Sequence, residues 1–166
     1  MRVLGIDPGI ARLGWGVIEE KEGKQKALVY DCITTQKSTS EPERLSQIFA
    51  QLTEIIAQYK PEMMAVEDLF FATNAKTAFQ VGQARGVVLL AAAQAKLPVV
   101  SYSPLKIKMA IVGYGQARKH QVQRMVTSML GLKQTPKLDD TADALAVGLT
   151  HLALNKFNQA VKRVKS

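Results

Sequence analysis

The order of short apolar segments constrains the fold of this chain more than any other feature. Three apolar or alternating runs, 2–7, 13–19 and 26–35, are separated by a Pro8-Gly9 turn and by a charged turn that contains glycine. Runs of this length, bounded by turn residues, are typical of β-strands that form a meander. Strand-like and helix-like segments then alternate along the chain, which predicts a mixed sheet with helices on both faces.

The rest of the chain supplies the predicted helices and two more strands. Apolar residues recur at helical spacing over 41–60, and Pro42 with its acidic neighbours favours a helix N-terminus there. Segments 63–70 and 98–102 have the length and apolar content of buried strands. Further helices are predicted at 74–95, 104–111, 119–130 and 139–154. We therefore predict one α/β domain over 1–155, followed by a basic tail, 156–166, whose low apolar content indicates disorder.

Length and composition are those of a single intracellular domain. A chain of 166 residues can bury about 70% of its unfolded surface, so its core needs no disulfide. The one cysteine, Cys32, cannot form an internal disulfide, which is typical of a reducing compartment. No signal peptide follows Met1, and the longest apolar run, 86–93, is too short to span a bilayer. We expect a cytoplasmic protein without a membrane partner.

Charge is distributed unevenly along the chain. The net charge is +8, and the stretch from Leu69 to Leu138 contains no acidic residue, whereas ten of its residues are basic. Such a distribution favours a polyanionic partner. Nucleic acid is favoured over a membrane surface because the basic residues are spread over several segments and do not form one amphipathic helix. A basic surface that is merely solvated remains the alternative.

Four acidic residues interrupt apolar segments. Asp7 ends the first strand, Glu67 lies in a strand that is otherwise apolar, and Asp140 and Asp143 begin the last helix on nearly one face. Several carboxylates are buried together only where cations share the space. Mg²⁺ and Mn²⁺ prefer oxygen ligands, so the four residues indicate a metal site suited to phosphoryl transfer.

Each acid also has a purely structural interpretation. Asp7 could form the turn that follows it. Glu67 or Asp68 could reach solvent at the end of a strand, and Asp139 or Asp140 could cap the last helix. Spacing alone does not choose between the members of either pair.

Four short motifs occur in order along nearly the whole chain. They are Gly-Ile-Asp-Pro-Gly at 5–9, Glu-Asp-Leu-Phe at 67–70, Gly-Gln-Ala-Arg-Gly at 82–86 and Asp-Thr-Ala-Asp-Ala-Leu-Ala at 140–146. Each motif is weak alone, but the ordered set resembles the RuvC family of Holliday junction resolvases. The resemblance implies an RNase H-like α/β fold, with a mixed five-stranded sheet flanked by helices on both faces. It also implies an endonuclease of DNA recombination and repair that cuts four-way junctions by paired, symmetric nicks.

The same resemblance assigns roles to individual residues. It implies that two Mg²⁺ ions per subunit, with Mn²⁺ tolerated, are held by the catalytic carboxylates Asp7, Glu67, Asp140 and Asp143. An exposed aromatic beside a nuclease site can stack on an unpaired base or can simply plug a core, and the resemblance favours stacking for Phe70. The segment 106–119 places cations around a glycine-rich turn suited to phosphate contact. Within it, the DNA-binding residues expected are Lys108, Arg118 and Lys119.

The helix predicted at 74–95 contains two glycines, although each glycine lowers the stability of a helix by about 1 kcal/mol relative to alanine. Gly82 and Gly86 lie four residues apart, and they allow close approach either of a second subunit or of the sheet within one subunit. The resemblance favours a homodimer interface, and a dimer suits a junction of near two-fold symmetry. It also implies the RuvA–RuvB branch-migration complex as a partner.

Three other functions stay open from the sequence. An ATP-binding fragment of the actin and sugar-kinase type shares the Gly-Ile-Asp-x-Gly start, but it needs a second lobe and usually a hydroxyl residue where this chain has Ile10. An RNase H-like nuclease that acts on RNA would keep the fold and the metal site. A non-catalytic nucleic-acid-binding module would not require buried acids.

Overall fold

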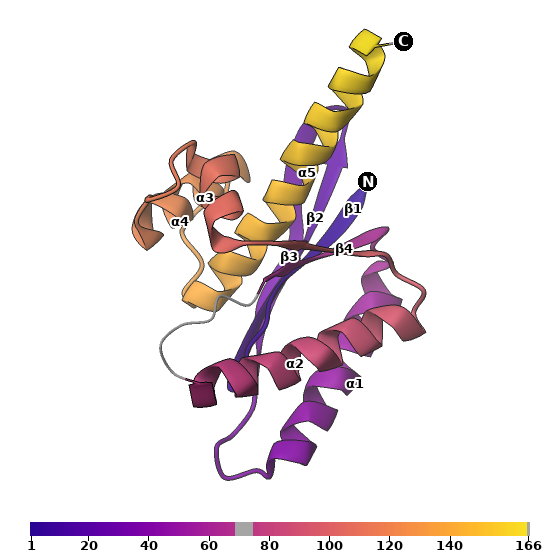
Figure 1. Cartoon of the computed structure of the whole chain (residues 1–166), viewed down its shortest axis with the longest axis vertical. Coiled ribbons are helices and arrows are strands. Elements are labelled where there is room, and N and C mark those ends of the chain that lie inside the picture. The colour runs from indigo at the N-terminus through magenta and orange to yellow at the C-terminus, as the bar shows by residue number, and fades with distance from the viewer. Residues whose placement is uncertain (69–74, 166) are drawn as a thin grey trace.

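The computed structural model of the chain describes the backbone of residues 1–68 and 75–165 and the side chains of residues 1–68 and 78–156. Ten helices and strands follow one another within these residues (Figure 1). They are β1 (Arg2–Asp7), β2 (Arg12–Lys21), β3 (Lys24–Thr34), α1 (Glu41–Tyr59), β4 (Met63–Glu67), α2 (Ala75–Gln94), β5 (Val99–Tyr102), α3 (Pro104–Val112), α4 (Lys119–Met129) and α5 (Asp139–Lys165).

One mixed sheet of five strands forms the centre of the molecule, in the order β3-β2-β1-β4-β5. The first three strands are antiparallel neighbours. Glu22 and Gly23 both have positive φ and form the two-residue turn between β2 and β3, a geometry that matches the twist of a hairpin. Strands β1, β4 and β5 are parallel, and α1 and α2 provide the crossovers that parallel pairing requires. The predicted mixed sheet is confirmed.

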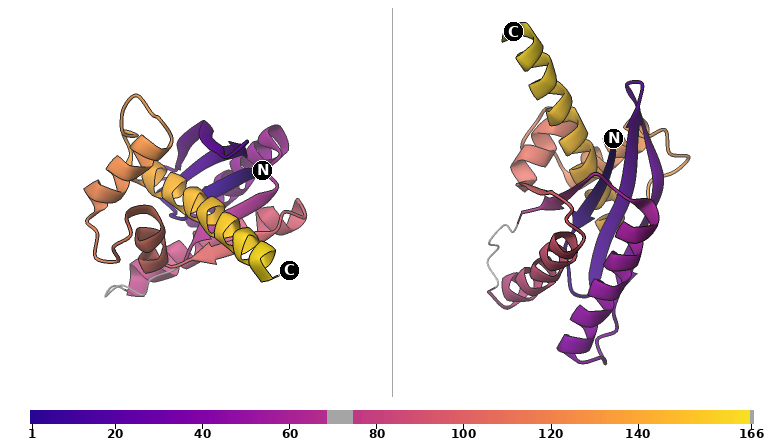
Figure 2. Two further views of the ribbon diagram at one scale, coloured as in Figure 1. Left: turned by 90° about the horizontal axis from the view of Figure 1, so that it is seen from above. Right: turned by 90° about the vertical axis from the view of Figure 1, so that its right-hand side faces the viewer.

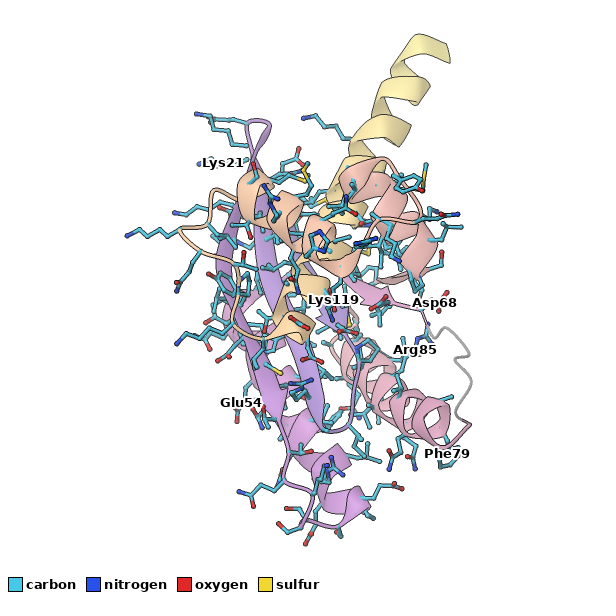
Figure 3. The ribbon with its side chains drawn as sticks, turned by 90° about the vertical axis from the view of Figure 1, so that its left-hand side faces the viewer. Lys21, Glu54, Asp68, Phe79, Arg85 and Lys119 are labelled. Carbon is cyan, nitrogen blue, oxygen red and sulfur yellow. The ribbon has the colours of Figure 1, made fainter. Side chains whose placement is uncertain are left out.

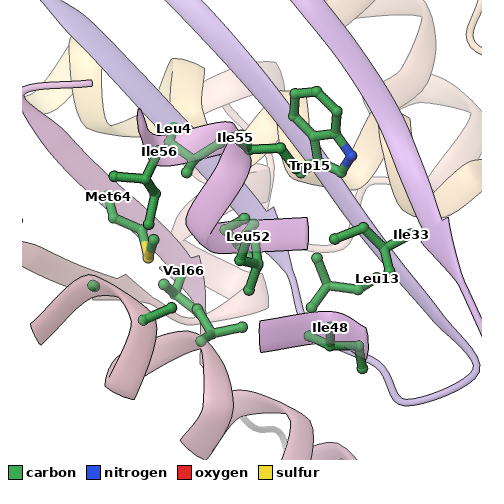
Figure 4. Close-up of a cluster of buried hydrophobic side chains, with 14 of the residues drawn as sticks. Leu4, Leu13, Trp15, Ile33, Ile48, Leu52, Ile55, Ile56, Met64 and Val66 are labelled. Carbon is green, nitrogen blue, oxygen red and sulfur yellow. The ribbon is translucent and has the colours of Figure 1, made fainter. Parts of the chain in front are cut away.

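Helices α1 and α2 cover one face of the sheet (Figure 2). Alternate residues of β1 and β4 point to this side, and full burial of one such aliphatic side chain contributes about 1.5–3 kcal/mol. The core of this face includes Leu4, Ile6, Leu52, Met64 and Val66, all of them fully buried (Figure 4).

The opposite face is covered by α5, with α3 and α4 packed against that helix (Figure 1). Glycines of the sheet allow α5 to approach β1 and β2 very closely. A Cβ added to Gly5 would meet the backbone of Ala144, and one added to Gly14 would meet the backbone of Asp140. The first turns of α5 therefore lie directly on the sheet, at the end of β1.

One predicted boundary was wrong. The sequence suggested that the last helix ends near Leu154 and that a disordered tail begins at 156, whereas α5 continues to Lys165. Residues 155–165 contain neither glycine nor proline, so nothing in this segment terminates a helix already nucleated by packing. In the described part of the chain, no helix is both long and apolar enough to cross a membrane.

Candidate active site

Strands β1 and β4 direct two carboxylates to the same face of the sheet. The strands are parallel neighbours, with Ile6 opposite Val66, and both of these side chains lie in the core beneath α1 and α2. Because successive side chains alternate between faces, Asp7 and Glu67 point to the other side, where α5 lies. The period of the strand thus explains why Glu67, rather than Asp68, joins Asp7.

Helix α5 brings the other two carboxylates to the same place. The side chains of Asp140 and Asp143 are 21% and 24% exposed, whereas that of Asp139 is 59% exposed. Asp139 faces outward and accepts a hydrogen bond from Gln123 Nε2 (2.9 Å). The close packing of α5 against Gly14 fixes the position of the first turn of the helix, and therefore the positions of Asp140 and Asp143.

Neighbouring carboxylates oppose the ionisation of Asp7. Burial, followed by repulsion from Glu67, Asp143 and Asp140, raises the pKa of Asp7 to about 9. Burial is also the main cause that raises the pKa of Glu67 and that of Asp143. Without added cations, the cluster therefore cannot hold four full negative charges at neutral pH.

Two basic side chains offset part of this charge. Lys119 Nζ lies 2.8 Å from Asp143 Oδ2 and 3.4 Å from Asp139 Oδ2. Arg12 Nε lies 3.1 Å from Asp140 Oδ2, but its direction is not that of a hydrogen bond, and this buried oxygen has no hydrogen-bond partner within the part of the chain that the structure describes. Arg12 was not singled out by the sequence. Its only signal was a cation between the Asp7 turn and the second strand.

A cleft of about 220 Å³ opens beside the cluster. Its charged lining consists of two acids, Glu67 and Asp143, and two lysines, Lys108 and Lys119. The remaining lining is mainly apolar and comes from Pro104, Ile107, Val122 and Ala146. A phosphate in this cleft would lie between carboxylates that can hold cations and lysines that can neutralise it.

The donor set fits a hard divalent cation, although the acids are not arranged around one. Within the described residues, no three His, Cys, Asp or Glu side chains are placed so as to hold a metal ion together. Asp140 and Asp143 are paired with Arg12 and Lys119 instead. The fit is chemical: four oxygen-donor groups, three raised pKa values and one buried carboxylate oxygen without a hydrogen-bond partner.

The other predicted site residues have different positions. Arg118 is exposed at the start of α4, where its backbone N–H donates to Gln121 Oε1 (2.7 Å), and it does not line the cleft. Phe70 lies outside the described residues. On α2, Gly82 is half-buried and Gly86 is exposed, and a Cβ added to Gly86 would meet nothing within 4 Å. Packing on the sheet therefore does not explain Gly86.

Comparison with known proteins identifies the family. The sequence model described as "Crossover junction endodeoxyribonuclease RuvC" matches residues 3–151. The chain belongs to the RuvC family. It is 52% identical to the crossover junction endodeoxyribonuclease RuvC of Moorella thermoacetica over 164 residues, which cover 99% of this chain and 98% of that protein.

Solved structures of the RuvC family have the same fold. Thermus thermophilus RuvC has a TM-score of 0.87 at 40% identity and covers 95% of this chain and 97% of its own. T. thermophilus RuvC in complex with Holliday junction substrate also has a TM-score of 0.87, at 37% identity, with 95% and 96% covered. The yeast mitochondrial Holliday junction resolvase Ydc2 shares the fold at 15% identity, with a TM-score of 0.65. The RNase H-like α/β fold is thereby confirmed.

Proposed function

We propose that this chain is a metal-dependent endonuclease that resolves four-way DNA junctions by hydrolysing one phosphodiester in each of two opposed strands. The observation that carries the proposal is the half-buried cluster of four carboxylates beside a cleft with a basic wall. Membership of the RuvC family supports the substrate, since T. thermophilus RuvC has been solved in complex with a Holliday junction.

Membership of a nuclease family of this type implies dependence on a divalent metal. We propose Mg²⁺, two ions per subunit, held by Asp7, Glu67, Asp140 and Asp143, with Mn²⁺ able to replace it because it accepts the same oxygen ligands. Ions bound there would supply an activated water and stabilise the charge that develops on the leaving oxygen.

The protein's own side chains bind and orient the DNA strand. Lys108 and Lys119 line the same cleft as Glu67 and Asp143 and neutralise the charge of a phosphate that enters it. Lys119 exchanges its contact with Asp143 for one with the phosphate, so the same lysine stabilises both the free and the bound site. The apolar side chains of Pro104, Ile107 and Val122 limit the access of water to this wall and strengthen these interactions.

The exposed face of α2 supports a homodimer. Phe79 and Leu90 are 68% and 51% exposed, and Gly86 lies between them with open space above it. Residues 79, 86 and 90 are spaced so that they lie on one side of a helix. We propose this stripe as the subunit interface, with Gly82 at its border. Coupling to the RuvA–RuvB complex stays a prediction from the family alone.

Cleavage of defined substrates tests the proposal. A labelled synthetic four-way junction is compared with a linear DNA duplex of the same arms and with an RNA–DNA hybrid, in Mg²⁺ and in EDTA. We expect paired, symmetric nicks in the junction only, in Mg²⁺ only, and none with Asp7→Asn. Asp31→Asn makes the same change at an exposed acid of β3 and should cut normally. Cutting of the hybrid instead would assign the site to RNA, and junction binding without cutting would contradict a catalytic role.

A further inference from the structure

Two successive acids at the end of β4 point to opposite faces of the sheet. Glu67 lines the cleft on the α5 side, whereas Asp68 continues the alternation toward α2. The backbone N–H of Asp68 donates to Tyr102 O (2.9 Å), so pairing with β5 extends one residue beyond Glu67. Whatever holds Asp68 therefore also determines how the strand presents Glu67.

Arg85 of α2 makes the side-chain contact to Asp68 (Figure 3). Its Nη2 donates to Asp68 Oδ1 (3.1 Å) and to Ser101 Oγ of β5 (2.8 Å). One guanidinium nitrogen thus links the C-terminal end of β4, next to Glu67, to the C-terminal end of its neighbour β5. The Arg85 side chain is only 21% exposed, whereas that of Asp68 is 49% exposed.

This contact is not explained by stability. An ion pair with one partner half-exposed contributes little to the free energy of folding, typically about 0–1 kcal/mol. Moreover, Arg85 Nε is buried and has no hydrogen-bond partner among the described residues 1–68 and 78–156, which costs the free energy of desolvating that group. A contact that adds little stability and leaves a buried donor unsatisfied indicates a role in geometry.

Helix α2 can hold Arg85 in a fixed position, because the helix is packed tightly against the sheet. Ala84 and Val88, on either side of Arg85 in the sequence, are fully buried in the core between α2 and the sheet. The backbone that carries Arg85 is therefore fixed relative to β4, and the position of its guanidinium follows from the packing of the whole helix.

We infer that Arg85 is a positioning residue, which acts through Asp68 and Ser101 to fix the direction in which β4 presents Glu67 to the cleft. The inference rests on the proposed function, because it assigns Glu67 a role as a metal ligand. Groups that orient a ligand from behind typically change metal affinity or activity by about 10- to 100-fold when removed. Loss of about 1 Å of positional accuracy has an effect of the same order.

The test uses the full chain with Arg85→Gln, Arg85→Lys, Asp68→Asn and the double variant Arg85→Gln/Asp68→Asn. Three quantities are measured: Mn²⁺ affinity by electron paramagnetic resonance, the single-turnover rate of junction cleavage at saturating protein, and junction affinity in EDTA. Thermal unfolding reports whether each variant is folded. Arg2→Gln is the control, because it breaks another arginine–carboxylate pair, Arg2–Glu19 (2.8 Å), neither residue of which lines the cleft.

We expect Arg85→Gln and Asp68→Asn each to weaken Mn²⁺ binding and to slow cleavage by about 10- to 100-fold. Junction affinity in EDTA should stay within about twofold of the wild-type value. Arg85→Lys should lose less Mn²⁺ affinity and cleavage rate than Arg85→Gln, because it keeps the charge that pairs with Asp68. The double variant should be no worse than the poorer single variant, since both changes remove one contact.

Several results would overturn the inference. One is that Asp68→Asn and Arg85→Lys bind Mn²⁺ and cut the junction as well as the wild-type protein does. Another is that the losses of the two single variants multiply in the double variant. A third is that Arg2→Gln loses as much Mn²⁺ affinity and cleavage rate as Arg85→Gln does. If Arg85→Gln does not fold, the half-exposed Asp68→Asn still decides the question. A wild-type protein that binds Mn²⁺ but cuts no junction would overturn the proposed function alone, because the Mn²⁺ affinities of the variants test the positioning role without cleavage.

Discussion

Replacement of Asp7 by asparagine should stabilise the metal-free protein while abolishing cleavage. Asp7 is half-buried among three other carboxylates, and these surroundings raise its pKa from the ordinary value of 3.8 to about 9. Asparagine has nearly the same shape and is neutral without binding a proton, so it avoids the cost of protonating a carboxyl group beside Glu67 and Asp143 and leaves no cavity. The proposed metal site would explain why the protein keeps an arrangement that the fold alone disfavours.

The size of the effect follows from the shift in pKa. One pKa unit corresponds to about 1.4 kcal/mol. At pH 7 the folded state must keep a proton on Asp7 that the unfolded chain releases, and this difference costs at most about 4 kcal/mol. Lys119 offsets part of the repulsion within the cluster through its contact with Asp143, so we expect a gain of about 1–4 kcal/mol for Asp7→Asn. For a domain of this size, that gain corresponds to a rise in Tm of roughly 3–10 °C.

The pH dependence has a defined sign. Because the folded pKa lies above the unfolded one, the folded state binds more protons between about pH 4 and pH 9. The stability of the wild-type protein in EDTA should therefore fall as pH rises through this range. The raised pKa values of Glu67 and Asp143 act in the same direction, so Asp7→Asn should reduce the slope without abolishing it.

Thermal unfolding of the wild-type protein and of Asp7→Asn in EDTA, at several pH values from 5 to 9, measures this difference. The gap in Tm should widen with pH, and excess Mg²⁺ should narrow it by stabilising the wild-type protein more. Asp31→Asn, at an exposed position of β3, is the control and should leave Tm unchanged. If Asp7→Asn were less stable than the wild-type protein at every pH, the account of the site as a cluster of mutually repelling buried acids would be wrong.

Three further predictions follow from contacts on both faces of the sheet. Gly14→Ala should lower the free energy of unfolding by about 1–3 kcal/mol and abolish cleavage, because its Cβ would displace the backbone of Asp140; normal cleavage would contradict the close seating of α5. Lys119→Ala should weaken junction binding and reduce the slope of log affinity against log salt by about 1, and an unchanged slope would place Lys119 away from phosphate. Leu90→Asp, at an exposed position of α2, should dissociate the proposed dimer in analytical ultracentrifugation without loss of helicity, and a dimer that persists would place the interface elsewhere.

Much of the fold could be predicted from the sequence because turn residues mark the ends of its elements. Pro8-Gly9 follows β1, Gly23 lies in the β2–β3 turn, Pro61 precedes β4, and Pro104 is the first residue of α3. At the end of α5 no such residue occurs. The continuation of that helix to Lys165 could not be predicted from composition, because basic and polar residues are compatible with both a helix and a disordered tail.

The candidate site could be predicted only in part. An acid within an apolar strand can be recognised from its immediate sequence neighbours, and for this reason Asp7 and Glu67 could be predicted as site residues. The contacts of Arg12 with Asp140 and of Arg85 with Asp68 join residues that are far apart in sequence. These contacts depend on how α5 and α2 pack against the sheet, and that packing geometry cannot be predicted from a single sequence.

The four carboxylates are contributed by positions scattered from one end of the chain to the other. Asp7 belongs to the first strand and Asp143 to the last helix, so nearly the whole polypeptide must be synthesised before they can meet. A chain interrupted anywhere before Asp140 carries at most half of the set. If these four residues form the catalytic site, as proposed, incomplete products of translation or proteolysis would lack part of that site and would not cut DNA.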